Sequence, residues 1–177
     1  MYRVAVLGHS LVPSEFVCSV SGVQIFLYRR PGATWDDINC VEFRDFWARQ
    51  FDLAIILLGG NDLASVEAYT AFCKFKDFVQ AALHCSPKII VYSVEPRDYD
   101  NQSRFNISTR EFNARRHRYN RMAKRWIRRL GHNFIDLGKP WIARERTRDG
   151  VHFNAIANQG LTRSINRVIR GVFQINL

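Results

Sequence analysis

The chain has 177 residues, 47% of them hydrophobic and 13% aromatic, which excludes a disordered segment and allows a core of full size. No apolar run approaches the roughly 20 residues of a membrane-spanning helix, and the N-terminus has no signal-peptide pattern. The formal net charge of +10 leaves a polyanionic partner open, either a nucleic acid or an anionic membrane surface.

The sequence contains neither repeats nor a linker, so we expect residues 1–177 to form a single domain. Its four cysteines show no CxxC or zinc-like spacing. Disulfides remain open, but we expect buried free thiols, which indicates a reducing compartment and hence the cytosol or nucleus.

The chain begins with two predicted strands and a helix. Residues 2–7 begin with alternating polar and apolar side chains and continue as an apolar run, which predicts a strand. A second strand is expected over residues 23–28. A Pro-Gly turn at 31–32 closes the second strand. Thr34 is then expected to cap a helix that continues toward Arg49, with acidic residues in its first turn.

The middle of the chain predicts a strand, a helix and another strand. Residues 52–58 are apolar on both faces, as in a central parallel strand. Asp62 or Ser65 is expected to begin a helix that ends near residue 84, and residues 88–93 predict the fourth strand.

The last third predicts a polar loop over residues 95–107 and a long amphipathic helix that begins at Ser108 or Thr109 and ends before Gly131. A short fifth strand, a loop and a final helix follow, over residues 133–136, 139–149 and 155–172. The apolar stripes of these two helices and of the helix that ends near residue 84 are expected to face the core, and they include Tyr69, Leu130 and Ile156.

Strands that alternate with helices predict an α/β fold with a parallel, doubly wound sheet. In such sheets, binding and catalysis gather at the carboxyl ends of the strands. Because Ser10, Gly32 and Asn61 each follow the end of a predicted strand, we expect them to share one site.

Ser10 stands in the run Val6-Leu7-Gly8-His9-Ser10-Leu11, directly after the first strand, where we expect it to begin a helix. A serine hydroxyl becomes a useful nucleophile when a base takes its proton. Taken alone, Ser10 is better explained as an N-cap and nothing more.

A second run, Asp149-Gly150-Val151-His152-Phe153-Asn154, places a carboxylate and an imidazole three residues apart. His152 is a candidate general base for Ser10, and Asp149 could orient its ring and stabilise the imidazolium. The alternative is structural, with Asp149 capping the final helix and His152 packing.

Two further stretches offer donors for a developing oxyanion. Gly59-Gly60-Asn61-Asp62 ends the most apolar strand, and an Asn61 side-chain N–H can face such a charge. Gly32 could contribute a backbone N–H. Each stretch alone is also a plain turn, but together with Ser10 and the Asp149/His152 pair they indicate a serine hydrolase.

These four blocks, in this order, resemble the SGNH, or GDSL-type, hydrolase superfamily. Gly8-His9-Ser10-Leu11 is similar to its nucleophile block, and Gly59-Gly60-Asn61-Asp62 and Asp149-x-x-His152 to two later ones. The resemblance implies a three-layer, flavodoxin-like α/β sandwich with five parallel strands in the order 2-1-3-4-5. It also implies a Ser10-His152-Asp149 triad, and an oxyanion hole formed by Ser10, Gly32 and Asn61.

Members of this superfamily cleave esters, thioesters and acetyl groups on lipids and sugars, so the resemblance implies a short-chain acyl esterase that needs no metal or cofactor. His9 departs from the pattern, because the family has Asp at this position. We expect a structural role for His9, since its adjacency to Ser10 makes a productive hydrogen bond awkward. The Gly-His-Ser variant also resembles esterase domains encoded by retroelements.

Positive charge is concentrated in the C-terminal part. Residues 101–177 contain 17 Lys/Arg against 4 Asp/Glu, whereas residues 1–100 contain 9 against 12. The alternative function is therefore a nucleic-acid-binding module on an SGNH scaffold; a solvated helix face explains the charge equally well. Helical spacing selects five candidate contacts: Arg110, Arg118, Arg121, Arg125 and Arg128.

Overall fold

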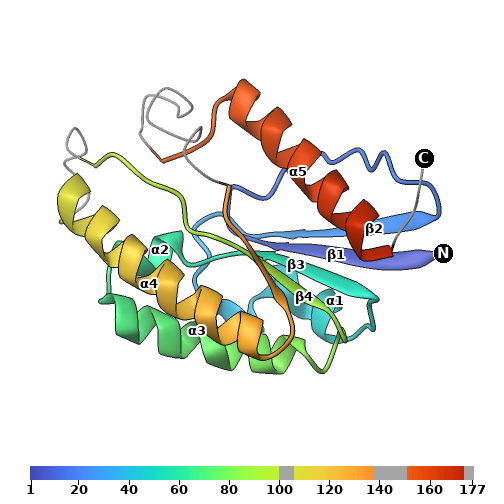
Figure 1. The fold of residues 1–177 in the computed structure, drawn as a ribbon, viewed down its shortest axis with the longest axis horizontal. Coiled ribbons are helices and arrows are strands. Elements are labelled where there is room, and N and C mark those ends of the chain that lie inside the picture. Colours follow the sequence, from blue (N-terminus) through green and yellow to red (C-terminus); the bar gives the residue numbers. More distant parts are fainter. Residues whose placement is uncertain (100–105, 138–150, 174–177) are drawn as a thin grey trace.

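The computed structural model describes residues 1–99, 106–137 and 151–173. Its centre is a sheet of five parallel strands (Figure 1), in the order β2-β1-β3-β4-β5. The strands are β1 (Tyr2–Gly8), β2 (Val23–Arg29), β3 (Leu53–Leu57), β4 (Ile89–Tyr92) and β5 (Asn133–Ile135). Both the α/β class and the 2-1-3-4-5 order are confirmed.

Helices cover both faces of the sheet (Figure 1). The helices α3 (Ala68–Ala82) and α4 (Thr109–Arg129) pack on one face, and α5 (Ala155–Phe173) packs on the other. Alternating strand residues divide between two cores: Ala5 and Leu7 face the first, whereas Val4 and Val6 face the second.

The two cores differ in composition. The one under α3 and α4 is rich in large rings, including Trp35, Phe75 and Tyr119, which pack edge to face. The one under α5 is mainly aliphatic, as at Ile55 and Ile165.

The helix predicted from Thr34 toward Arg49 is wrong. The segment forms two 3₁₀ turns (Asp37–Asn39 and Val41–Phe43) and a short helix, α1 (Arg44–Trp47). The carboxylate of Asp37 accepts hydrogen bonds from the Thr34 N–H at 2.8 Å and the Thr34 hydroxyl at 3.2 Å. Thr34 is therefore bound by a side chain and does not act as a cap, and Cys40 adopts an extended conformation that interrupts the helix.

The helix predicted from Asp62 or Ser65 is divided into α2 (Gly60–Leu63) and α3, with Glu67 extended between them. The guanidinium of Arg115 on α4 donates to the carbonyls of Leu63 at 3.1 Å and Val66 at 3.2 Å. The guanidinium of Arg115, from a distant part of the sequence, thus donates to carbonyls that would accept backbone hydrogen bonds in a continuous helix.

Ser10 does not begin a helix, which corrects a further prediction. The chain from 9 to 22 turns without one, and α5 holds it from outside through Asn166. The Asn166 side chain accepts from the Ser19 N–H and donates to the Val17 carbonyl.

The predicted end signals of α4 are confirmed, since the Ser108 hydroxyl accepts from the Glu111 N–H at 3.1 Å and Gly131 has a φ of +80°. Three stripe residues expected inside are instead exposed: Tyr69, Leu130 and Ile156. They lie at or next to the ends of α3, α4 and α5.

All four cysteines are free thiols, but only Cys85 is buried. Within the part of the chain that the structure describes, no helix is long and apolar enough to cross a membrane.

Candidate active site

Ser10 lies just beyond the carboxyl end of β1, where the chain passes close to β3. A Cβ on Gly8 would stand 2.0 Å from the carbonyl oxygen of Leu57, so the side-chain-free residue permits this approach. The His9 N–H donates to the same carbonyl at 3.1 Å. The backbone before the predicted nucleophile is therefore fixed against the central strand.

His152 meets Ser10 across 142 residues of sequence. Nε2 of His152 lies 3.1 Å from Oγ of Ser10, within hydrogen-bonding distance. Its neighbours anchor it, since Val151 is buried in the aromatic core and Phe153 in the aliphatic one. Asn154 directly precedes α5, and its side chain caps the helix by accepting from the Ala157 N–H at 3.0 Å. Asp149 lies outside the described residues.

Gly32 and Asn61 line one cleft with Ser10 and His152. The Asn61 side-chain Nδ2 donates to the carbonyl of Ala33 at 2.9 Å, which joins α2 to the turn after β2. The structure thus brings together every predicted triad and oxyanion residue that it describes.

A buried carboxyl group makes a second link between these segments. Both carboxyl oxygens of Asp62 lie near the Trp35 N–H, at 3.2 and 3.3 Å. Asp62 is 3% exposed, and this burial raises the pKa of its carboxyl group to about 7.

Arg97 is the residue of this site that the sequence interpretation missed. It follows β4, is 5% exposed, and lines the cleft with Asn61. Its Nη1 donates to Oδ1 of Asn61 at 3.2 Å and to the Tyr99 hydroxyl at 2.9 Å. A signal was present, since Arg97 comes soon after a strand that adjoins β3, at the edge where the other candidates lie.

Ser10 borders two clefts. The first has a volume of about 840 Å³ and a polar wall that includes Thr34, Asn61, Ser65 and Asn106. The second, of about 530 Å³, lies between the loop after Ser10 and the start of α5. An ester bond held at Ser10 can therefore extend its two substituents in different directions.

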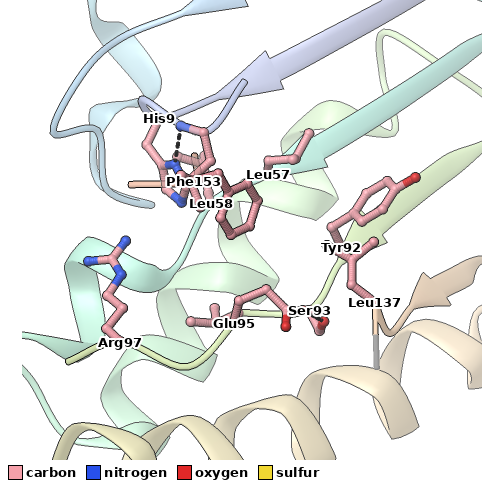
Figure 2. Close-up of a pocket in the computed structure, with 11 residues that line it drawn as sticks. His9, Leu57, Leu58, Tyr92, Ser93, Glu95, Arg97, Leu137 and Phe153 are labelled. Atoms are coloured by element: carbon pink, nitrogen blue, oxygen red, sulfur yellow. Dashed lines mark hydrogen bonds between the residues drawn. The ribbon is translucent and has the colours of Figure 1, made fainter. Parts of the chain in front are cut away.

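His9 lines a smaller pocket beside these clefts (Figure 2). Its Nδ1 accepts a hydrogen bond from the Leu11 N–H at 3.1 Å, which Figure 2 shows as a dashed line. His9 is 4% exposed, and its ring shapes the turn around Ser10. This bond supports the structural role that we expect for His9.

The described residues contain no group of three His, Cys, Asp or Glu side chains arranged to hold a metal ion. The five candidate nucleic-acid contacts lie on α4, away from this cleft lining, and each is exposed.

The model of the GDSL-like lipase/acylhydrolase family matches residues 12–159. No curated protein matches the sequence significantly.

Solved structures share the fold. A carbohydrate acetylesterase from Sinorhizobium meliloti, Est24, is 18% identical with a TM-score of 0.79, over 97% of this chain and 100% of that one. A carbohydrate esterase of family 3 from Talaromyces cellulolyticus is 16% identical with a TM-score of 0.74, over 99% and 100%. The aryl esterase of M. smegmatis is 16% identical with a TM-score of 0.75, over 97% and 99%.

Proposed function

Because the chain belongs to the GDSL-like lipase/acylhydrolase family, and is thus a serine esterase of the SGNH type, we propose that it hydrolyses short-chain acyl esters, of the acetyl type, through Ser10, His152 and Asp149. The observation that carries the proposal is the 3.1 Å contact between Nε2 of His152 and Oγ of Ser10. The two residues come from opposite ends of the chain, and they meet beside two further oxyanion candidates.

In the proposed reaction, Oγ of Ser10 attacks the acyl carbon while Nε2 of His152 accepts the hydroxyl proton. The carbonyl oxygen becomes an oxyanion that faces the N–H groups of Ser10 and Gly32 and the side chain of Asn61. His152 then gives its proton to the departing alcohol, which leaves an acyl group on Ser10. Water activated by His152 attacks this ester, releases the acid and restores the serine.

The role of Asp149 rests on its spacing from His152 and on the family pattern. A carboxylate near the other ring nitrogen would hold the imidazole with Nε2 toward Ser10, and would stabilise the imidazolium formed in each step.

The substrate class is inferred from the cleft and from the relatives. Hydroxyl and amide side chains line the larger cleft, which suits a polar alcohol such as a sugar. The similar solved structures include a carbohydrate acetylesterase and a carbohydrate esterase. We therefore propose a small acyl group on a polar alcohol.

The test compares p-nitrophenyl esters of increasing chain length, together with an acetylated oligosaccharide. We expect the fastest turnover on the acetate and a fall to background in Ser10→Ala. The matched control is Ser21→Ala, since Ser21 is an exposed serine of the same loop that lines neither cleft. A Ser10→Ala protein with most of the wild-type rate would contradict the serine mechanism, and a preference for long chains would contradict the substrate class.

A further inference from the structure

The side-chain amide of Asn61 lies between a hydrogen-bond donor and a hydrogen-bond acceptor. Its Oδ1 accepts from the guanidinium of Arg97 at 3.2 Å, and its Nδ2 donates to the Ala33 carbonyl at 2.9 Å. A guanidinium can only donate, and a carbonyl can only accept. A reversed amide would lose both bonds and set donor against donor, so the pair of contacts determines the orientation of Asn61.

Arg97 is itself held firmly. Its Nη1 also donates to the Tyr99 hydroxyl at 2.9 Å, and its guanidinium lies 5.5 Å from the centre of the Phe112 ring. Gly60 leaves the space for it, because a Cβ there would stand 2.2 Å from Nη2 of Arg97. The glycine beside Asn61 thus permits the approach of the guanidinium that orients Asn61.

Arg97 has no carboxylate partner among the residues that the structure describes. A buried cation usually pairs with an acid, and removing that partner is strongly destabilising. Here the positive charge instead meets neutral oxygens at the edge of the cleft, and one of them belongs to the proposed oxyanion donor.

We propose that Arg97 is a positioning residue for the ester hydrolysis, acting through Asn61; this inference rests on the proposed function. With one N–H of Nδ2 bound to Ala33 and Oδ1 bound to Arg97, the second N–H of Nδ2 is left for the oxyanion. A cationic donor on the amide oxygen also polarises the amide, which strengthens that N–H as a donor. Both effects stabilise a charge that exists in the transition state and not in the bound ester.

The experiment is a double-mutant cycle on the whole chain with p-nitrophenyl acetate. Asn61→Ala should lower kcat by about 10²–10³. Arg97→Met keeps the length of the side chain but removes the donor, and it should lower kcat by roughly 10–100-fold with KM within about twofold. In the Asn61→Ala background, Arg97→Met should change kcat by less than about threefold, because the group through which Arg97 acts is already gone.

Arg97→Lys retains a cationic donor and should recover part of the rate that Arg97→Met loses. Arg129→Met removes an exposed arginine at the end of α4 and should leave kcat unchanged. Thermal unfolding of each variant checks the fold. Should Arg97→Met fail to fold, Arg97→Lys is compared with and without Asn61→Ala in its place.

Two results would overturn the inference. Effects of Arg97 and Asn61 that multiply would show that Arg97 acts independently of the amide. A rise in KM at constant kcat would show that Arg97 contributes to binding of the ester and not to stabilising the transition state. Either result leaves the esterase proposal intact, whereas an inactive wild-type protein or an active Ser10→Ala variant would defeat that proposal first.

Discussion

The two halves of the candidate site differ in how their functional side chains are oriented. Buried polar groups hold the oxyanion half: Asp62 bonds Trp35, and Arg97 bonds Asn61. In the nucleophile half, backbone hydrogen bonds such as that from His9 to Leu57 and the burial of apolar neighbours such as Val12 fix the chain. One described hydrogen bond then joins the reacting side chains of Ser10 and His152.

Hydrogen bonds determine the orientation of a side chain, whereas apolar burial fixes the backbone and leaves the side-chain rotamer to local partners. The oxyanion half is therefore oriented before substrate binds. In the nucleophile half, the burial of Val151 and Phe153 fixes the position of His152. Its ring then depends on a further group for orientation, which is the role that we propose for Asp149.

The largest effect in this comparison should come from His152→Ala. Loss of the general base should lower kcat by about 10²–10⁴, because Ser10 would attack without transferring its proton to an imidazole. Steady-state kinetics with p-nitrophenyl acetate measure this loss. Activity near the wild-type rate would show that the 3.1 Å contact has no catalytic role.

Asp149→Ala tests the orientation of the ring and should cost less than His152→Ala. The anchoring of Val151 and Phe153 keeps the imidazole near Ser10 even without the carboxylate. A loss as large as that of His152→Ala would mean that apolar anchoring alone does not keep the base in a useful orientation.

A smaller effect should appear in the pH dependence of thermal stability when Asp62 is replaced. The pKa of Asp62 lies near 7 in the folded protein because of burial, against about 3.9 in an unfolded chain. Because the pKa is higher in the folded protein, the neutral carboxyl group of Asp62 favours the folded state. This contribution to the free energy of unfolding is complete below about pH 4 and is lost as the pH rises toward 7. Asp62→Asn keeps an oxygen that can accept from the Trp35 N–H but cannot ionise.

We therefore expect Tm of Asp62→Asn, relative to wild type, to rise between pH 4 and pH 7.5 by several degrees, on the order of 5 °C. Thermal unfolding of both proteins at the two pH values checks this. An equal Tm difference between the two proteins at both pH values would show that the carboxyl group does not titrate in this range.

The strands could be predicted from sequence because each is a short apolar run bounded by turn residues, as at Gly59 after β3. Their alternation with helices implied a parallel sheet, but their order came from the family resemblance. The helix interruptions could not be predicted, because their causes are contacts with distant residues. Arg115 lies 52 residues from the Leu63 carbonyl that it binds.

The same reasoning applies to the site. Ser10, Gly32, Asn61 and His152 stand in motifs, and the positions of the first three after strands led to one edge of the sheet. Arg97 belongs to no such motif. Its contact with Asn61, 36 residues away, arises when β3 and β4 pair and place their carboxyl ends side by side. Local periodicity carries no information on that contact.

The smallest effect on hydrolysis should come from α4. The exposed arginines of its outer face include the five candidate contacts, whereas Arg115 turns inward to bind carbonyls. If this face binds nucleic acid, retention of single-stranded RNA should fall with salt at about −0.7 in log–log slope per phosphate neutralised. The five are Arg110, Arg118, Arg121, Arg125 and Arg128.

Reversal of one of these charges distinguishes a binding face from a solvated one. Arg121→Glu should weaken RNA retention and reduce the salt slope by roughly one phosphate, with kcat unchanged, because Arg121 does not line the cleft. Arg44→Glu makes the same change of charge at an exposed position on α1 and should leave retention close to wild type. Equal losses in the two variants would indicate a response to net charge alone. No retention by the wild-type chain at low salt would mean that the arginines solvate the helix, and liposomes with anionic lipids would then be the next partner to test.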